Sequence, residues 1–220
     1  FAAAITALAV SLGSLGTDRA FAQGPPLTLP QPSQAATVSQ TVGLTEVTVT
    51  YHRPRVQGRE IWGKVVPYGE VWRAGANENT TITFEHDVKI EGKDIKAGTY
   101  GVHMAIWPDK ATIIFSNQSG SWGSFYYDEK NDALRVDVKP VKLDKSVEYL
   151  KYEFIEHKPK YCVIALQWEM LSIPFKVEVD VENIVIAKLR DEVTSQKGFN
   201  AFNLLAAANY CINNNLNLEE

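Results

Sequence analysis

The sequence contains few of the side chains that metal sites and covalent catalysis need. Its 220 residues include two cysteines and four histidines. Cys162 and Cys211 lie far apart and neither belongs to a CxxC pair, while the histidines match no metal-ligand spacing. We therefore expect no metal site.

Motifs for nucleotide binding and hydrolysis are missing as well. The sequence has no Walker A loop, no dinucleotide fingerprint and no EF-hand pattern. Gly120–Ser124 (GSWGS) lacks the GxSxG order of a nucleophile elbow. These absences favour a protein that is not an enzyme and that uses no cofactor. The net charge of −4 argues against a nucleic-acid partner.

Long apolar runs are also absent, apart from a short one that ends at Leu15. It is too short to cross a bilayer core of about 30 Å. Ala20-Phe21-Ala22 then provides the small-x-small pattern of a signal peptidase site before Gln23. We predict a signal peptide over residues 1–22 and an exported protein, periplasmic or extracellular, without stable membrane insertion after signal removal. A membrane anchor or a mature helix is the alternative.

Export bears on the two cysteines, because an oxidising compartment would allow them to pair. Cys162 and Cys211 fall in different expected elements. Two buried free thiols therefore fit the sequence better than a disulfide, which stays open as the alternative.

The rest of the chain divides by its periodicity. Residues 23–35 form a proline-rich lead-in that we expect to be flexible. Over residues 36–181 apolar and polar residues alternate, as in Val47–Tyr51 and Leu134–Val138, and turn signals separate about ten short strands. Strands with one apolar face bury it against a second sheet. The pattern predicts an all-β domain, an antiparallel, jelly-roll-like β-sandwich.

Residues 182–220 change to helical spacing and predict a helical hairpin. Asn213–Asn215 ends its second helix, and Asn217 with Glu220 has the spacing of a new N-terminal cap. A hairpin followed by a new start is typical of tetratricopeptide-like repeats. We interpret it as the truncated start of such a helical region, in a natural protein that is longer at both ends.

What the sequence has in excess is arginine within one segment, Tyr51–Asn79. It holds four of the seven arginines but only one of the 15 lysines: Arg53, Arg55, Arg59, Arg73 and Lys64. Guanidinium offers a planar fork for carboxylates or phosphates and a face that stacks on aromatic rings. The segment is too rich in Gly, Pro and charge to be a strand. Its aromatic residues predict an ordered connection across one end of the sandwich, possibly with a helical turn.

The same segment carries a resemblance to a known family. Its motifs are Tyr51-x-Arg53-Pro54, Gly58-Arg59-x-Ile61-Trp62-Gly63 and Pro67-Tyr68-Gly69-x-Val71-Trp72-Arg73-x-Gly75-Ala76-Asn77, followed by Ala97-Gly98-Thr99-Tyr100 and Trp122-Gly123. From about Ser33 to Asp180 the chain resembles the bacterial domain of unknown function 2911. Ala111 departs from the pattern, since such proteins tend to carry a Trp there. The resemblance implies an exported all-β domain, often with helical repeats behind it, and implies no activity or catalytic residue.

A candidate ligand-binding site follows from the arginine segment and one strand beside it. His103 joins it because it shares a strand face with the small residues Gly101 and Ala105, which leave room for another group. The candidate residues are Arg53, Arg59, Trp62, Trp72, Arg73, Asn77 and His103. We predict a non-enzymatic binding module for an acidic or polar small molecule, a sugar or an envelope protein.

Three alternatives remain at this point. The arginines could be structural and pair with Glu60, Glu70, Glu78 or Asp128. The protein could be an unrecognised hydrolase with a carboxylate/His site. It could also be a structural adaptor that uses its helical tail for protein–protein contacts.

Overall fold

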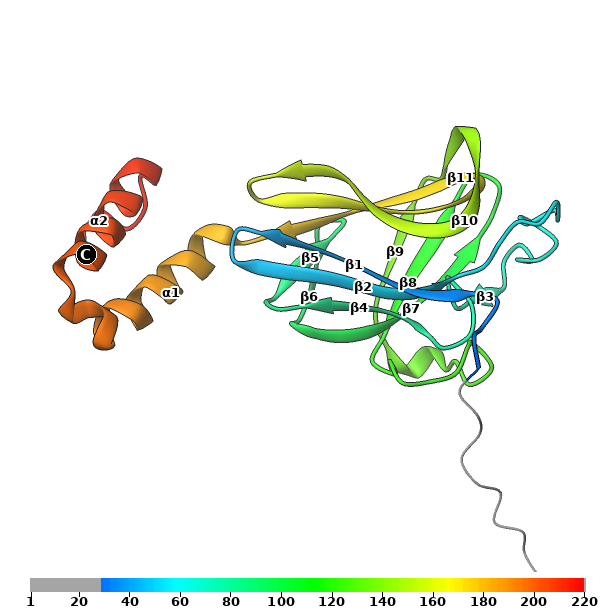
Figure 1. The fold of residues 1–220 in the computed structure, drawn as a ribbon, viewed down its shortest axis with the longest axis horizontal. Coiled ribbons are helices and arrows are strands. Elements are labelled where there is room, and N and C mark those ends of the chain that lie inside the picture. Colours follow the sequence, from blue (N-terminus) through cyan, green and yellow to red (C-terminus); the bar gives the residue numbers. More distant parts are fainter. Residues whose placement is uncertain (1–28, 220) are drawn as a thin grey trace, which may run out of the picture. The chain divides into compact units, whose positions relative to one another are not determined.

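The computed structural model describes residues 29–219. The predicted signal peptide and residues 23–28 of the lead-in lie outside the described residues. The strands are β1 (Gln34–Val42), β2 (Thr45–Arg53), β3 (Val71–Trp72), β4 (Thr80–Phe84), β5 (Val88–Ile90), β6 (Lys93–Ile95), β7 (Gly98–Ile106), β8 (Ala111–Ser116), β9 (Asp132–Val138), β10 (Val141–Lys158) and β11 (Tyr161–Val179). The helices are α1 (Val181–Thr194) and α2 (Ala201–Asn214), with 3₁₀ turns at Glu129–Asn131 and Gln196–Phe199 (Figure 1).

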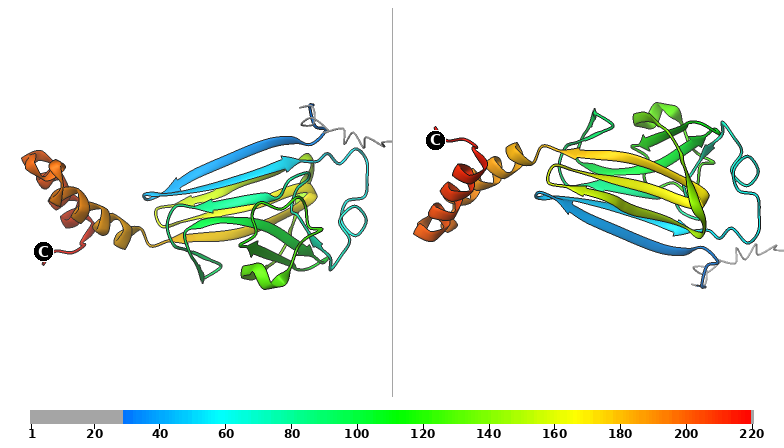
Figure 2. Two further views of the ribbon diagram at one scale, coloured as in Figure 1. Left: turned by 90° about the horizontal axis from the view of Figure 1, so that it is seen from below. Right: turned by 90° about the horizontal axis from the view of Figure 1, so that it is seen from above.

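Two antiparallel sheets form the sandwich. The larger sheet has the order β1-β2-β4-β7-β8-β9, with β3 paired to β7, and the smaller has the order β10-β11-β5-β6. The two layers are visible in both views of Figure 2. The predicted all-β sandwich followed by a helical hairpin is confirmed.

The alternation of the sequence explains where the core lies. Val47, Val49 and Tyr51 of β2 are buried, whereas the residues between them are not. The two sheets meet through such faces: Phe115 of β8 contacts Phe175 of β11, with ring centroids 6.1 Å apart. Burial of apolar area at roughly 25 cal/mol per Å² stabilises this arrangement.

Two strands of the smaller sheet, β10 and β11, are longer than the sequence pattern predicts. β10 and β11 have 18 and 19 residues, because register shifts in their pairing lie between Lys142 and Val147, between Val147 and Lys151, and between Phe154 and Glu156. Bulges of this kind let a strand continue where its alternation changes phase. The prediction of short strands is therefore wrong for this hairpin.

The connection Tyr51–Asn79 is ordered, but it is not free of strand. Val71–Trp72 form β3 and pair with Met104–Ala105 of β7. β4 covers β7 only over Gly98–Val102, so the rest of that edge is open to β3. A β-branched and an aromatic residue suit this position. No helix forms within residues 51–79, all of which are described.

The helical hairpin begins directly after the sandwich. The Asp180 side chain accepts from the backbone N–H of Asn183 at the start of α1, and Asn200 caps α2 in the same way through Phe202. Asn215 ends α2 in the left-handed conformation (φ 53°). The described part contains two α-helices, so a repeat array is not confirmed. Neither helix has the length and apolar character needed to cross a membrane.

The two cysteines are both free. Cys162 of β11 is buried, and burial raises the pKa of its thiol to about 11. Cys211 of α2 is only half-buried. The expectation of free thiols is confirmed, but burial is correct for Cys162 alone.

Candidate functional site

A groove of about 520 Å³ lies beside β3 at one end of the sandwich. We call it the arginine groove and define it by six of its lining residues: Arg55, Arg59, Arg73, Trp72, Trp122 and Trp168. The described residues that line it include no Asp, Glu or His. The groove therefore concentrates positive charge in a chain whose net charge is −4.

Trp72 and Trp168 line the groove, whereas Trp62, a sequence-predicted site residue, does not line it and packs against both. The rings of Trp72 and Trp168 are nearly parallel, at 18°, with centroids 5.8 Å apart. Trp62 contacts both rings edge-on, at 6.2 and 5.9 Å. Because Trp72 belongs to β3 and Trp168 to β11, this cluster joins the two sheets. The indole N–H groups of Trp62 and Trp168 are buried without a partner among the described residues.

Arg73 follows β3 and lies against the loop Gly120–Tyr127. Its Nη1 donates to the carbonyl oxygen of Asn77 at 2.7 Å, and its Cζ lies 5.1 Å from the Trp122 ring centroid. A Cβ on Gly123 would lie only 2.8 Å from that Cζ, so a larger residue there would displace the guanidinium, and the positive φ of Gly123 (+69°) also favours glycine. No carboxylate pairs with Arg73 among the described residues.

Arg59 and Arg55 form the opposite part of the lining. Arg59 donates from Nε to the carbonyl of Val56 at 3.1 Å and from Nη2 to that of Arg55. Arg55 is the one groove arginine with an ion pair in the described chain, at 3.5 Å from Glu148. Arg59 and Arg73 thus have only neutral partners, which leaves two guanidinium charges uncompensated.

Arg53 does not line the groove, although the sequence placed it with the others. Its Nε donates to the carbonyl oxygen of Leu150 at 3.0 Å, and its guanidinium lies 5.6 Å from the Tyr149 ring centroid. Leu150 and Tyr149 belong to β10, so Arg53 joins β2 of one sheet to β10 of the other. Its contacts are structural.

The carboxylates expected as structural partners do not pair with the arginines. Glu78 lies 3.2 Å from His52 Nε2, and Asp128 caps the turn Glu129–Asn131. No ion pair joins Glu60 or Glu70 to any arginine in the described chain. Backbone carbonyls and aromatic rings position the guanidinium groups instead.

Asn77 lines the groove and also shapes it. Its backbone has φ 56°, a left-handed conformation that Asn tolerates better than most residues. Its side chain donates to the carbonyl of Ser33 at 3.0 Å, while its own carbonyl accepts from Arg73. Asn77 therefore connects the residues before β1 to the Arg73 side of the groove.

His103 is not open to a ligand, contrary to the sequence-based expectation. It is 2% exposed, and Nδ1 lies 2.9 Å from the hydroxyl of Ser124. Burial is the main cause that lowers the pKa of His103 to about 4, with the nearby charge of Asp132 opposing the shift and that of Arg73 contributing to it. The room beside Gly101 is taken by neighbouring segments, since a Cβ there would lie 2.7 Å from the Gln118 carbonyl oxygen and 3.3 Å from Asn79 Nδ2. Ser124 of the loop Gly120–Tyr127 lies against His103 itself. His103 positions this loop.

Sequence reasoning missed Arg55, Trp122 and Trp168 as groove residues. Trp168 sits within an ordinary alternating strand, so nothing local distinguishes it. The loop, in contrast, carried a usable signal: Trp122, Phe125, Tyr126 and Tyr127 are four aromatic residues within six positions. Such a density in a polar, glycine-containing loop is unusual.

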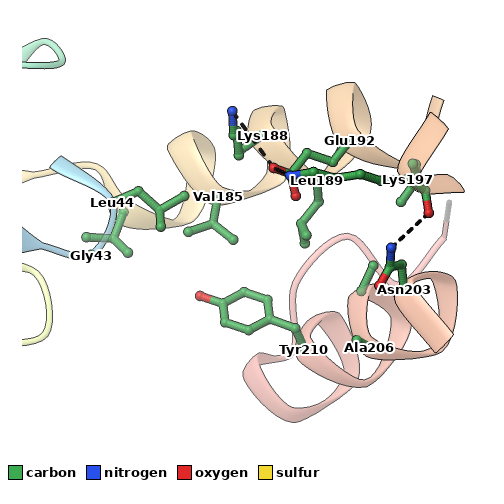
Figure 3. Close-up of a pocket in the computed structure, with 13 residues that line it drawn as sticks. Gly43, Leu44, Val185, Lys188, Leu189, Glu192, Lys197, Asn203, Ala206 and Tyr210 are labelled. Atoms are coloured by element: carbon green, nitrogen blue, oxygen red, sulfur yellow. Dashed lines mark hydrogen bonds and ion pairs between the residues drawn. The ribbon is translucent and has the colours of Figure 1, made fainter. Parts of the chain in front are cut away.

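A larger cavity, of about 760 Å³, lies between the β1–β2 turn and the helical hairpin. Figure 3 shows Leu44, Val185 and Leu189 on one side of it and Tyr210 on the other. Its lining also holds Lys188, Glu192 and Lys197, but both lysines pair with Glu192, so their charges are compensated, unlike those of Arg59 and Arg73.

The arrangement of the arginine groove suits binding better than catalysis. General acid–base work needs two titratable groups within hydrogen-bond reach, and the described lining offers only guanidinium groups, which keep their proton. Within residues 29–219 no three His, Cys, Asp or Glu side chains gather in a way that could hold a metal ion.

Comparison with known proteins gives one match. The model of a family described as a protein of unknown function (DUF2911) matches residues 33–177. No curated protein and no solved structure matches the chain.

Proposed function

Because the chain belongs to the DUF2911 family, whose description names no activity, we propose a function from the groove itself: a non-enzymatic binding module for an acidic ligand. The observation that carries the proposal is the uncompensated charge of Arg59 and Arg73 in a groove whose described lining has no acid. A carboxylate- or phosphate-bearing ligand would supply the missing partner. Aromatic surface with a few fixed polar groups is the usual composition of such sites.

The electrostatics support an anionic rather than a neutral ligand. Two unit charges about 4 Å apart attract by about 4 kcal/mol at an effective dielectric constant near 20. Arg59 and Arg73 are already oriented by carbonyl acceptors, so little side-chain freedom remains to be lost on binding. Both features favour a ligand that carries an anionic group, a carboxylate or a phosphate.

Export to the periplasm or the cell exterior belongs to the same proposal, with an envelope component or a small anionic or carbohydrate molecule as the partner. Mature protein recovered from cells would then begin at or near Gln23. N-terminal mass spectrometry tests this, and an intact Phe1 on the exported protein would contradict it.

Binding is tested by isothermal titration calorimetry with citrate and, separately, inorganic phosphate. Arg73→Lys keeps the charge but removes the planar fork, so we expect about tenfold weaker citrate binding. Arg59→Lys should act in the same direction. Arg53→Lys is the matched control, because Arg53 lies outside the groove and should leave the affinity unchanged. Failure of both acidic probes to bind, or equal affinity in all variants, would refute the proposed function.

A second candidate, the adaptor, has one observation in its favour. α2 has no buried residue, and Phe199 and Phe202 are 93% and 81% exposed. Apolar side chains left this open are available for protein–protein contacts. If they serve a partner rather than the fold, Phe202→Ser should leave the melting temperature unchanged. A fall of several degrees would assign Phe202 to the fold and remove this candidate.

A further inference from the structure

The loop Gly120–Tyr127 presents three large aromatic side chains to solvent. Trp122, Phe125 and Tyr126 are 54%, 76% and 73% exposed. Scattered apolar residues are normal on protein surfaces, but three within five positions form a patch, and such patches mark interaction sites. The loop contains no charged residue. Packing within the described chain therefore leaves a large part of these three aromatic side chains exposed.

The loop is held by specific contacts, so the exposure belongs to a defined surface. Ser124 bonds with His103, as described above. The Tyr127 hydroxyl donates to Asp132 at 2.7 Å and accepts from Arg135, and the backbone N–H of Asn79 donates to the Ser121 carbonyl at 3.3 Å. Contacts with His103 of β7 and with Asp132 and Arg135 of β9 therefore hold the loop that carries the aromatic side chains.

Trp122 and Phe125 form a stacked aromatic pair beside a cation. Their rings are within 5° of parallel, with centroids 6.1 Å apart. The Arg73 guanidinium lies 5.1 and 5.8 Å from the two centroids. We call this arrangement the aromatic platform, defined by Trp122, Phe125 and Arg73. Because Trp122 also lines the arginine groove, the platform and the groove are continuous.

Resting on the proposed binding function, we propose that the ligand is an acidic saccharide, whose sugar ring lies on Trp122 and Phe125 while its carboxylate binds Arg73. A pyranose ring has one face made of C–H groups, which matches a flat aromatic surface. Its hydroxyls remain at the ring edge, where an open platform leaves them hydrated or within reach of neutral groups such as Ser121 and Asn77. A uronate carboxylate matches the guanidinium fork.

A nucleotide is the competing ligand, since a base also stacks on aromatic rings. The loop favours the saccharide for two reasons. It has no Lys or Arg of its own to follow a phosphate backbone, and the highly exposed Phe125 offers an aromatic face that suits a ring with a single apolar face. The nucleotide is therefore a separate arm of the test.

The experiment measures affinities by calorimetry for four probes: trigalacturonate, neutral maltotriose, citrate and adenosine monophosphate. Phe125→Ala should weaken trigalacturonate binding by about tenfold, the scale of one lost stacking contact. Citrate binding should weaken much less, because Arg73 keeps its bond to the Asn77 carbonyl oxygen and its contact with Trp122. Phe125 is 76% exposed, so its loss should not affect folding. Phe199→Ala, at an exposed Phe on the helical hairpin, is the matched control and should change neither affinity.

Gly123→Ala provides a second, independent variant. Its Cβ would lie 2.8 Å from Arg73 Cζ and must displace the guanidinium without changing the charge of the protein. We expect weaker binding of both trigalacturonate and citrate. Near-ultraviolet circular dichroism of each variant verifies that the fold is retained.

The outcomes separate the two proposals. Citrate binding that depends on Arg59 and Arg73, together with trigalacturonate binding no tighter and insensitive to Phe125→Ala, overturns the saccharide and leaves the acidic-ligand function standing. Adenosine monophosphate binding more tightly than trigalacturonate, with loss in Phe125→Ala, also overturns it. Failure of every acidic probe overturns both. Tight, Phe125-dependent trigalacturonate binding supports both.

Discussion

Arginines only a few positions apart in this chain have different roles, because their partners differ. Arg53 donates to a carbonyl 97 residues away, on the other sheet. Arg59 donates to carbonyls three and four residues away and leaves its charge facing the groove. A guanidinium that connects sheets stabilises the fold, whereas one held locally with its charge uncompensated is available to a ligand.

Arg53→Lys should therefore lower stability. The variant loses the bond to Leu150 and the contact with Tyr149, which together are worth about 1 kcal/mol. For a domain of this size the melting temperature should fall by a few degrees. Arg59→Lys, measured by the same thermal melts, should show a smaller change because its bonds are local. A larger loss in Arg59→Lys would reverse the roles assigned here.

His103 should make stability depend on pH in the acidic range. Its folded-state pKa of about 4 is below the ordinary value of 6.5, because burial disfavours the charged ring. As the pH falls from 6.5 toward 4, the His103 ring becomes protonated in the unfolded chain but stays neutral in the folded chain. The stability present above pH 6.5 is thus lost progressively, by up to about 3 kcal/mol near pH 4.

Urea titrations at pH 7.5, 6, 5 and 4 measure this dependence, and His103→Gln isolates it. Wild type should lose more stability than the variant over the range, since the variant has no ring to protonate. Parallel pH curves for the two proteins would show that His103 is accessible and titrates normally.

At the scale of elements, the β1–β2 turn and the start of α1 are packed closely together. Gly43 has φ +61°, and a Cβ on it would lie 2.6 and 2.7 Å from the two methyl carbons of Val181. Val181 also packs against the core, which limits how far it can move. The close contact between this turn and Val181, the first residue of α1, therefore requires glycine at position 43.

Gly43→Ala should destabilise the protein through both strain and this contact. The positive φ alone costs about 1 kcal/mol for a residue with a Cβ, and the close approach adds to it. Gly92→Ala is the matched control, because Gly92 has φ +80° but open space around its Cβ position. Thermal melts should show a greater loss for Gly43→Ala. Equal losses would mean that Val181 moves freely and that the contact has no effect.

For the whole molecule, the balance of charge matters. The chain carries a net charge of −4, yet the groove presents arginines without acids. An anion is therefore repelled by the protein at a distance and attracted close to the groove. Such local attraction is screened by salt, since the Debye length falls from about 10 Å at 0.1 M to about 3 Å at 1 M.

Citrate affinity should accordingly weaken several-fold between 50 and 500 mM sodium chloride. Binding also raises the melting temperature, by more the further the ligand concentration exceeds Kd, so thermal shift at a fixed citrate concentration and each salt concentration measures the effect. The shift should shrink with salt in wild type and change less in Arg73→Gln, which has lost one groove charge. A shift independent of salt would argue that contacts other than charge hold the ligand.

Much of the architecture was predictable from the sequence, because alternation is a local property of a strand. In runs such as Val47–Tyr51 the apolar positions predict which face of the strand is buried, and Asn213–Asn215 predicts the end of α2. The long strands β10 and β11 and the short strand β3 were not predictable. Bulges change the phase of alternation, and β3 depends on an edge of β7 that β4 leaves open.

The sequence by itself determined the two-sheet fold, the helical hairpin and the arginine-rich segment that matches the family, since these follow from periodicity and motif. Only the tertiary structure decided which guanidiniums share a groove. It set Arg53 apart from the groove, against β10. It stacked Trp168 on Trp72, and placed the Gly120–Tyr127 loop against His103 and Arg73. These are contacts between residues about 20 to 100 positions apart, and they depend on strand register and sheet packing rather than on neighbours in the chain.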